Sequence, residues 1–160
     1  MPKSMDDHQE ILRKPSGGRA RPSKFDVYLD ENLCNCKPIL EVLAGHGVQV
    51  HRHLEFFQRG TPDDEWLPFV GKNGWAILTT DRRFRYNELE RIALQNHNLQ
   101  AFEFTDNQIG ASGMAQALKI ALPAMQTVLR HRRRYFVATI SKSGQVVVRW
   151  DSRWRRKRRT

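Results

Sequence analysis

Cysteine is scarce in this 160-residue chain, where the two cysteines, Cys34 and Cys36, lie one residue apart. That spacing is too short for an ordinary disulfide, and two cysteines are too few for a disulfide-stabilised secreted scaffold. Apolar runs of about eighteen residues or more are missing, as is the apolar segment of a signal peptide near the N-terminus. These absences predict a cytoplasmic protein with reduced thiols and no membrane partner.

A glycine-rich phosphate-binding loop of either common kind is also missing, so the sequence does not support nucleotide binding by that route. With 39% hydrophobic and 28% charged residues, the composition is that of one soluble globular domain. Cys34 and Cys36, together with His51 and His53, have the residue types of a zinc site. The cysteine spacing is shorter than is usual for zinc, and a small apolar role for the thiols is the alternative.

The net charge of +10 is unevenly distributed along the chain. Residues 1–24 carry six basic and three acidic side chains, residues 151–160 carry six and one, and residues 25–129 carry nine and thirteen. The body is therefore acidic, with a net charge of −4, whereas the ends are basic. A cationic tail attracts polyanions by releasing their counterions, and simple solvation or an acidic protein partner explains it equally well.

Hydrophobic periodicity predicts an α/β fold. Proline, glycine and serine without an apolar period predict a flexible leader over 1–24. The predicted strands are 25–29, 48–54, 75–79 and 99–104, and the predicted helices are 35–44, 61–70, 87–95 and 110–130. Strands that alternate with helices favour a central parallel sheet between helical layers over 25–134. A β-hairpin over 135–150 and a basic disordered tail over 151–160 are expected to follow.

Acidic side chains follow the predicted strands. Asp30 and Glu31 come after the first strand and Asp81 after the third, so they should share the carboxyl edge of the sheet. Asp63 and Asp64 begin the helix after the second strand, and a right-handed crossover places them at that edge too. Mg²⁺ or Mn²⁺ would offset the repulsion among these carboxylates and support phosphodiester hydrolysis. Helix N-terminal preference and turn formation explain the same acids without any metal.

Three short motifs occur in a fixed order, namely Leu-Asp-Glu-Asn-Leu at 29–33, Gly-Thr-Pro-Asp-Asp-Glu-Trp at 60–66 and Leu-Thr-Thr-Asp-Arg-Arg at 78–83. In this order and spacing they resemble the PIN-like domain family over 25–105, in particular its VapC-like branch of toxin–antitoxin systems. The resemblance implies a three-layer α/β/α PIN-like fold and a nuclease that uses Mg²⁺ or Mn²⁺ to cleave RNA. It also implies a partner antitoxin protein, and a homodimer is left open.

The resemblance carries over to individual acids. Asp30, Asp63 and Asp81 match the acidic positions of the family pattern and are predicted to be catalytic and to bind the metal. The secondary candidates for metal binding are Glu31, Asp64 and Glu90. The family also places an acid on the helix after the first strand, where Glu41 is the available residue and its match is left open.

Four arginines flank the acidic motifs and are predicted to bind RNA phosphates through their forked guanidinium groups, namely Arg59, Arg82, Arg83 and Arg85. Neutralising the neighbouring acids explains these arginines equally well. The alternative function is a non-catalytic nucleic-acid-binding or protein-interaction module. In that case the acids would only cap helices, and the basic tail would bind the partner.

Overall fold

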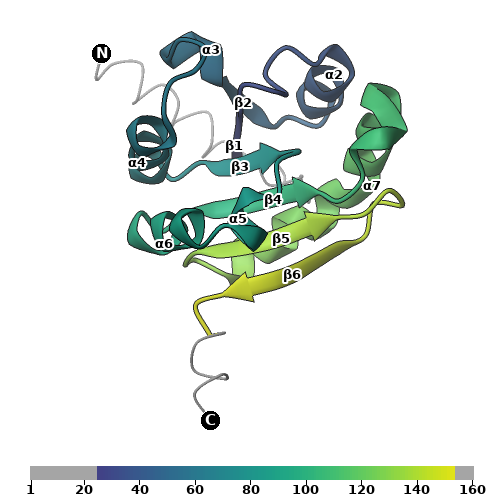
Figure 1. The fold of residues 1–160 in the computed structure, drawn as a ribbon. Coiled ribbons are helices and arrows are strands. Elements are labelled where there is room, and N and C mark those ends of the chain that lie inside the picture. Colours follow the sequence, from purple (N-terminus) through teal and green to yellow (C-terminus); the bar gives the residue numbers. More distant parts are fainter. Residues whose placement is uncertain (1–24, 154–160) are drawn as a thin grey trace, which may run out of the picture.

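A computed structural model describes residues 25–153 as a mixed α/β fold (Figure 1). In chain order the elements are β1 (Asp26–Leu29), α2 (Lys37–Gly45), β2 (Gln49–Arg52), α3 (His53–Phe56), α4 (Asp63–Asn73), β3 (Ala76–Thr79), α5 (Arg83–Tyr86), α6 (Glu88–Asn96), β4 (Gln100–Phe104), the 3₁₀ turn η2 (Asn107–Ile109), α7 (Gly110–His131), β5 (Phe136–Ile140) and β6 (Val146–Asp151). The four strands and four helices predicted before residue 132 are all present, with ends shifted by a few residues.

One six-stranded sheet runs through the molecule in the order β2-β1-β3-β4-β5-β6. The first five strands are parallel, and β6 returns antiparallel to β5 at the edge. The predicted hairpin is therefore β5 and β6, and it extends the same sheet because β5 pairs with β4. All five parallel strands end at one edge, which is where side chains that follow them gather.

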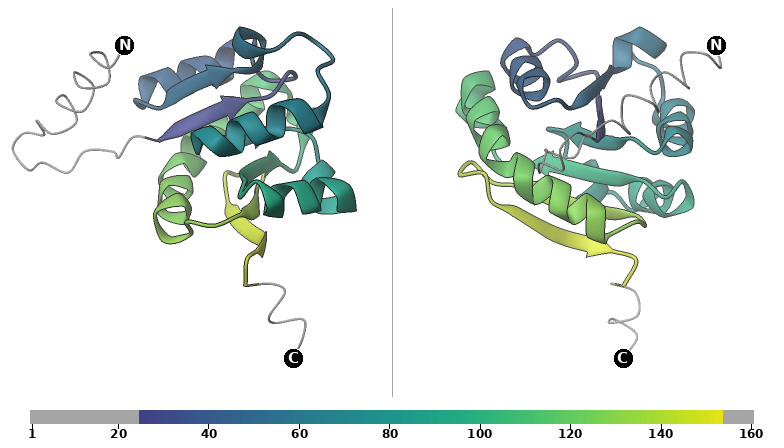
Figure 2. Two further views of the ribbon diagram at one scale, coloured as in Figure 1. Left: turned by 90° about the vertical axis from the view of Figure 1, so that its left-hand side faces the viewer. Right: turned by 180° about the vertical axis from the view of Figure 1, so that it is seen from behind.

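Alternating residues of the strands point into two separate hydrophobic clusters. Val27 and Leu29 of β1 join α2 and α7 on one face, whereas Tyr28 joins α4, α5 and α6 on the other. Figure 2 shows these helices covering the two faces of the sheet. Strands β1, β3, β4 and β5 are buried on both sides, as expected for a parallel sheet, whereas the edge strands β2 and β6 are only partly buried. The predicted three-layer α/β/α fold is confirmed.

The second crossover differs from the prediction. The strand expected over 48–54 ends at Arg52, and α3 begins directly, because the Glu55 carboxylate accepts a hydrogen bond from the Arg52 N–H (3.2 Å). Helix α4 continues past Val70 as far as Asn73, within the stop predicted at Gly71 to Gly74. It ends at Gly74, whose φ of 71° lies in the left-handed region that closes helices.

Two predictions concern the ends of the chain. The leader predicted over 1–24 lies outside the described residues. Asp151 belongs to β6 and Arg153 lies in the turn that follows, so residues 151–153 of the predicted disordered tail are part of the described structure. Residues 154–160 of the predicted tail lie outside the described residues. Between residues 25 and 153, no helix combines the length and the apolar character needed to cross a membrane.

Gly71 allows α4 to pack closely against the end of α6. A Cβ atom placed on Gly71 would lie 2.4 Å from the backbone oxygen of His97, so one of the two backbones would have to move. Gly71→Ala is therefore expected to lower the free energy of unfolding by about 1–3 kcal/mol, measured by urea denaturation. The matched control is Gly45→Ala at the end of α2, where a Cβ meets nothing within 4 Å. An equal effect of both substitutions would contradict this account.

Candidate functional site

Five buried polar or charged side chains of the described residues form a line across the sheet. They are Asp30, His53, Thr79, Glu103 and Thr139. Thr79 pairs with Glu103, and Glu103 pairs with Thr139. Asp30 follows Leu29, which pairs with both Leu78 and Arg52, so Asp30 lies between Thr79 and His53. We call these five residues the polar row; it crosses five parallel strands near their carboxyl ends, on the face covered by α4, α5 and α6.

Asp30 and Asp81 are connected through Thr79. The Asp30 carboxylate is buried and accepts hydrogen bonds from the Leu33 N–H (3.1 Å) and from the Thr79 hydroxyl. The same hydroxyl oxygen accepts a hydrogen bond from the backbone N–H of Asp81 (2.9 Å). Thr79 therefore fixes both the first carboxylate and the backbone that carries the second, and the predicted convergence of Asp30 and Asp81 on one edge of the sheet is present.

His53 continues the polar row on the other side of Asp30. Its Nδ1 lies 2.5 Å from the Tyr28 hydroxyl. Burial raises the pKa of Tyr28, and the nearby Asp30 carboxylate raises it further, so the phenol stays protonated and donates to Nδ1. The other ring nitrogen of His53, Nε2, has no hydrogen-bond partner among the described residues and lies 4.0 Å from Oε1 of Glu31.

Glu103 is a fully buried carboxylate in β4. Its Oε1 accepts from Nε of Arg85 (2.8 Å) and its Oε2 from the Phe84 N–H (3.1 Å). Burial raises the pKa of Glu103, the hydrogen bond and positive charge of Arg85 lower it, and the negative charge of Asp81 raises it. The negative charges of Glu103 and Asp81 therefore repel each other, which links the polar row to Asp81.

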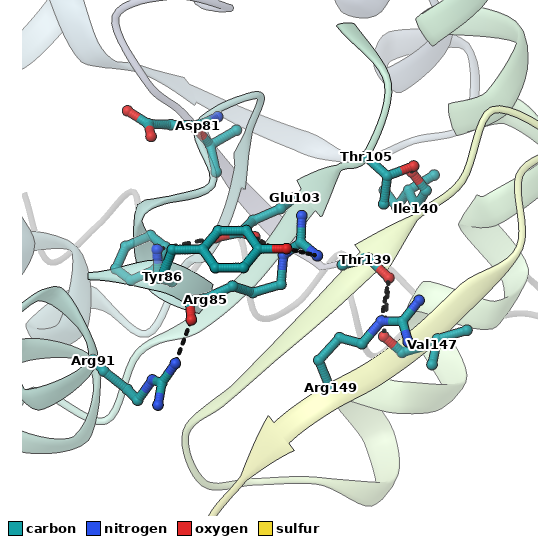
Figure 3. Close-up of polar contacts among 12 residues, drawn as sticks. Asp81, Arg85, Tyr86, Arg91, Glu103, Thr105, Thr139, Ile140, Val147 and Arg149 are labelled. Atoms are coloured by element: carbon teal, nitrogen blue, oxygen red, sulfur yellow. Dashed lines mark hydrogen bonds and ion pairs between the residues drawn. The ribbon is translucent and has the colours of Figure 1, made fainter. Parts of the chain in front are cut away.

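The polar row ends beside arginines and an exposed aromatic ring (Figure 3). Nε of Arg149 donates to the Thr139 hydroxyl (3.1 Å), and the Arg85 guanidinium lies over the ring of Tyr86, 4.9 Å from its centroid. Tyr86 is 70% exposed, which is unusual for so large an apolar ring. In Figure 3 the Asp81 carboxylate points away from the pair formed by Arg85 and Glu103.

The remaining predicted acids lie around this edge in different environments. Asp63 begins α4 and accepts a hydrogen bond from the indole N–H of Trp66 (3.0 Å), and that indole stacks on Tyr28. Asp64 is exposed beside it, in the first turn of the helix. Glu31 accepts from the Gly60 N–H (3.1 Å), and Glu90 is half-buried in the first turn of α6.

The predicted RNA-binding arginines differ in how their charges are used. Arg59 and Arg82 both have exposed side chains. Arg59 is 67% exposed, and its Nη1 lies 3.6 Å from Oε2 of Glu31. Arg85 is bound to Glu103, so its charge neutralises an acid inside the protein, which was the alternative role for these arginines. The side chain of Arg83 lies outside the described part of the structure.

Within residues 25–153, no group of three or more His, Cys, Asp or Glu side chains could hold a metal ion. The zinc alternative gains no support, because His51 binds Asp26 (2.8 Å) and stacks on Trp75, and the Cys34 thiol is buried. Two oxygen ligands from Asp30 and Asp81 nevertheless suit Mg²⁺ or Mn²⁺, since Mg²⁺ commonly takes one or two carboxylates and keeps several waters.

Sequence reasoning missed Thr79, Glu103 and the bond between Tyr28 and His53. The sequence could have indicated Glu103, because it is the single charged residue in the apolar run from Ala101 to Phe104, and a buried charge needs a buried partner. Thr79 gave no comparable signal, since threonine is ordinary in strands.

Comparison with known proteins gives one match. A family model described as a PIN-like domain matches residues 26–105, from β1 through β4. No curated protein and no solved structure matches the chain. The matched residues include Asp30, Thr79, Asp81 and Glu103, whereas α7 and the hairpin follow them. The match covers half of the chain and agrees with the three-layer fold, so this protein belongs to the PIN-like domain family.

Proposed function

We propose that this protein is a metal-dependent endoribonuclease that hydrolyses RNA phosphodiesters. PIN-like domains form a superfamily that includes nucleases. The observation that carries the proposal is the link from Asp30 through Thr79 to Asp81 at the carboxyl edge of the sheet. Ligand and catalytic sites of open parallel sheets lie outside this edge.

The chemistry of the donors fits a hard divalent cation. Asp30 and Asp81 would hold Mg²⁺ or Mn²⁺ together with several waters. The further predicted ligands, Asp63, Glu31, Asp64 and Glu90, form no group of three with this pair within residues 25–153. The bound ion would polarise a phosphoryl oxygen and make a water more acidic. Thr79 orients the Asp30 carboxylate and anchors the backbone that carries Asp81.

Positive charge near this edge would hold the RNA backbone. Arg59 and Arg82 have exposed side chains and are proposed to contact phosphates, as is Arg83. Arg85 acts differently in this proposal, because its bond to Glu103 keeps α5 in place after Asp81. The exposed ring of Tyr86 would offer a surface on which an unpaired base could stack.

A toxin role with an antitoxin partner is the finer form of this proposal. It is supported by the likeness of the three motifs to the VapC-like branch. An RNA-cleaving toxin would arrest bacterial growth when expressed without its antitoxin. The substitution Asp81→Asn should then abolish both RNA cleavage and growth arrest.

Asp81→Asn tests the proposal directly. We expect it to slow cleavage of single-stranded RNA by about 100-fold or more, because the substitution removes a charge from the candidate metal site while keeping the size of the side chain. Cleavage by the wild type should also stop in EDTA and return with Mg²⁺ or Mn²⁺. The assay follows a labelled RNA on a denaturing gel.

Asp26→Asn is the matched control, because Asp26 lies at the opposite end of β1, where it binds His51. This variant should cleave at the wild-type rate. Equal cleavage by the wild type and Asp81→Asn, in preparations free of host nucleases, would refute the nuclease proposal.

A non-catalytic nucleic-acid-binding module is the second candidate. The observation that favours it is the lack of a three-residue metal group within the described residues. Calorimetric titration with Mn²⁺ separates the two candidates. Heat of binding that disappears in Asp81→Asn supports the nuclease, whereas RNA binding that ignores divalent ions supports the module.

A further inference from the structure

A basic pocket lies at the end of the sheet opposite to the polar row. It has a volume of about 360 Å³, and its lining includes Arg132, Arg133, Arg134, Tyr135, Asp151 and Arg153. We call it the arginine pocket. Phe136 at the start of β5 pairs with Asp151 at the end of β6, so the pocket is at the amino ends of the parallel strands. It lies outside the part of the chain that the family model matches.

Hydrogen bonds hold both walls of the arginine pocket in place. The side-chain amide of Gln100 donates to the backbone oxygens of Arg132 (2.8 Å) and Arg134 (3.2 Å). Asp151 joins the walls, because its Oδ2 accepts from Nε of Arg132 (3.1 Å) and its Oδ1 from the N–H of Arg153 (2.9 Å). The one acid of the lining is thus engaged in fixing the pocket.

Three arginines of the pocket keep their charge available. Arg133, Arg134 and Arg153 have exposed side chains, and none of them forms an ion pair with a carboxylate of residues 25–153. Cations held together repel one another, and an anion between them relieves the repulsion. Guanidinium groups bind phosphate oxygens through two parallel N–H groups, so a phosphate group is a suitable anion.

The lining favours a nucleic-acid backbone over an acidic protein. Protein interfaces need an apolar core, and the large apolar side chains that are exposed in the described residues, such as Phe56 and Ile120, lie outside the pocket. Five of the six residues that follow Trp154 before the end of the sequence are Arg or Lys, so cationic residues continue along the chain after Arg153. Successive cations match successive phosphates.

We propose that the arginine pocket binds the phosphodiester backbone of single-stranded RNA, as a second contact remote from the polar row. The contact needs neither a divalent ion nor cleavage, and only the choice of RNA over another nucleic acid rests on the proposed function. A strand bound at both edges of the sheet would be held across the face of α6. Binding would then survive the loss of Asp81.

The double substitution Arg133→Ala and Arg134→Ala tests this proposal in the full chain. Fluorescence anisotropy with a labelled single-stranded RNA in EDTA measures binding without cleavage. At roughly 0.1 M salt we expect about tenfold weaker binding or more. The slope of log K against the logarithm of the salt concentration should be smaller in magnitude by about 1.4, since each lost phosphate contact contributes about 0.7 to that slope. Both side chains are exposed, so thermal unfolding should be unchanged.

The matched control, Lys72→Ala with Lys119→Ala, removes two positive charges from exposed positions on α4 and α7 outside the pocket. It should change the affinity by less than about twofold, because salt screens distant charges. Equal losses in both double variants would assign the effect to net charge and overturn the proposal. Unchanged binding by the pocket variant would also overturn it, as would equally tight binding of polyglutamate, which would indicate an acidic protein partner.

Discussion

Asp30→Asn is expected to slow RNA cleavage by at least about 100-fold while leaving the fold intact. Asparagine has the same shape and still offers an oxygen to the Leu33 N–H, so the turn after β1 should form as before. What disappears is the negative charge of Asp30 in the polar row, together with the acceptor of the Thr79 hydroxyl, because an amide NH2 takes the place of one carboxylate oxygen. The expected result is therefore a loss of activity without a loss of cooperative unfolding, measured by RNA cleavage and by urea denaturation of the same preparations.

Two variants of Thr79 test whether the hydroxyl that joins Asp30 to Asp81 is needed for metal-dependent cleavage. Thr79→Val removes the hydroxyl that joins Asp30 to the backbone of Asp81, whereas Thr79→Ser keeps it. We expect the valine variant to need about 10-fold to 100-fold more Mg²⁺ or Mn²⁺ for half-maximal cleavage, and the serine variant to stay close to the wild type. Wild-type cleavage by Asp30→Asn, or equal behaviour of the two Thr79 variants, would contradict the proposed role of this link.

The placement of Asp30 and Asp81 could be predicted because it follows from topology. Each acid comes directly after a strand whose apolar run is unambiguous, and parallel strands bring their carboxyl ends to one edge. The position of Asp63 could be predicted only as far as a helix start. The same residue type at a helix N-terminus serves the helix dipole, and the sequence contains nothing that distinguishes the two roles.

The side-chain partners inside the sheet could not be predicted, since they depend on register. Thr79 and Glu103 are neighbours only because β3 and β4 pair with Thr79 opposite Glu103, and a shift by one residue would separate them. Helix α5 was missed for a related reason. Arg83–Tyr86 has no apolar period of its own, and tertiary contacts hold it in place, with Phe84 in the core and Arg85 on Glu103.

Glu103→Ala is expected to cost about 3–5 kcal/mol of unfolding free energy, the largest effect on stability among these predictions. The substitution leaves the guanidinium of Arg85, which is only 17% exposed, without its counter-charge, and it leaves the Phe84 N–H without an acceptor. The double variant Arg85→Met with Glu103→Leu removes both charges and should recover the part of the loss that comes from the unpaired guanidinium, while the Phe84 N–H stays without its acceptor. Urea denaturation of the wild type, the single variants and the double variant measures this coupling. A Glu103→Ala variant as stable as the wild type would contradict it.

The pH dependence of stability gives an independent test of the same group. Because burial raises the pKa of Glu103 above 4.5, the carboxyl ionises less readily in the folded protein than in the unfolded chain. Its contribution to stability is therefore fully present below the unfolded pKa and declines as the pH rises through the folded pKa. The side chain in Glu103→Gln cannot titrate. Between roughly pH 4 and pH 7 the unfolding free energy of the wild type should therefore fall relative to that of the variant, because only the wild type has the Glu103 carboxyl group. Parallel stability curves for the two proteins over this range would contradict this prediction. They would mean that the pKa of Glu103 is the same in the folded protein as in the unfolded chain.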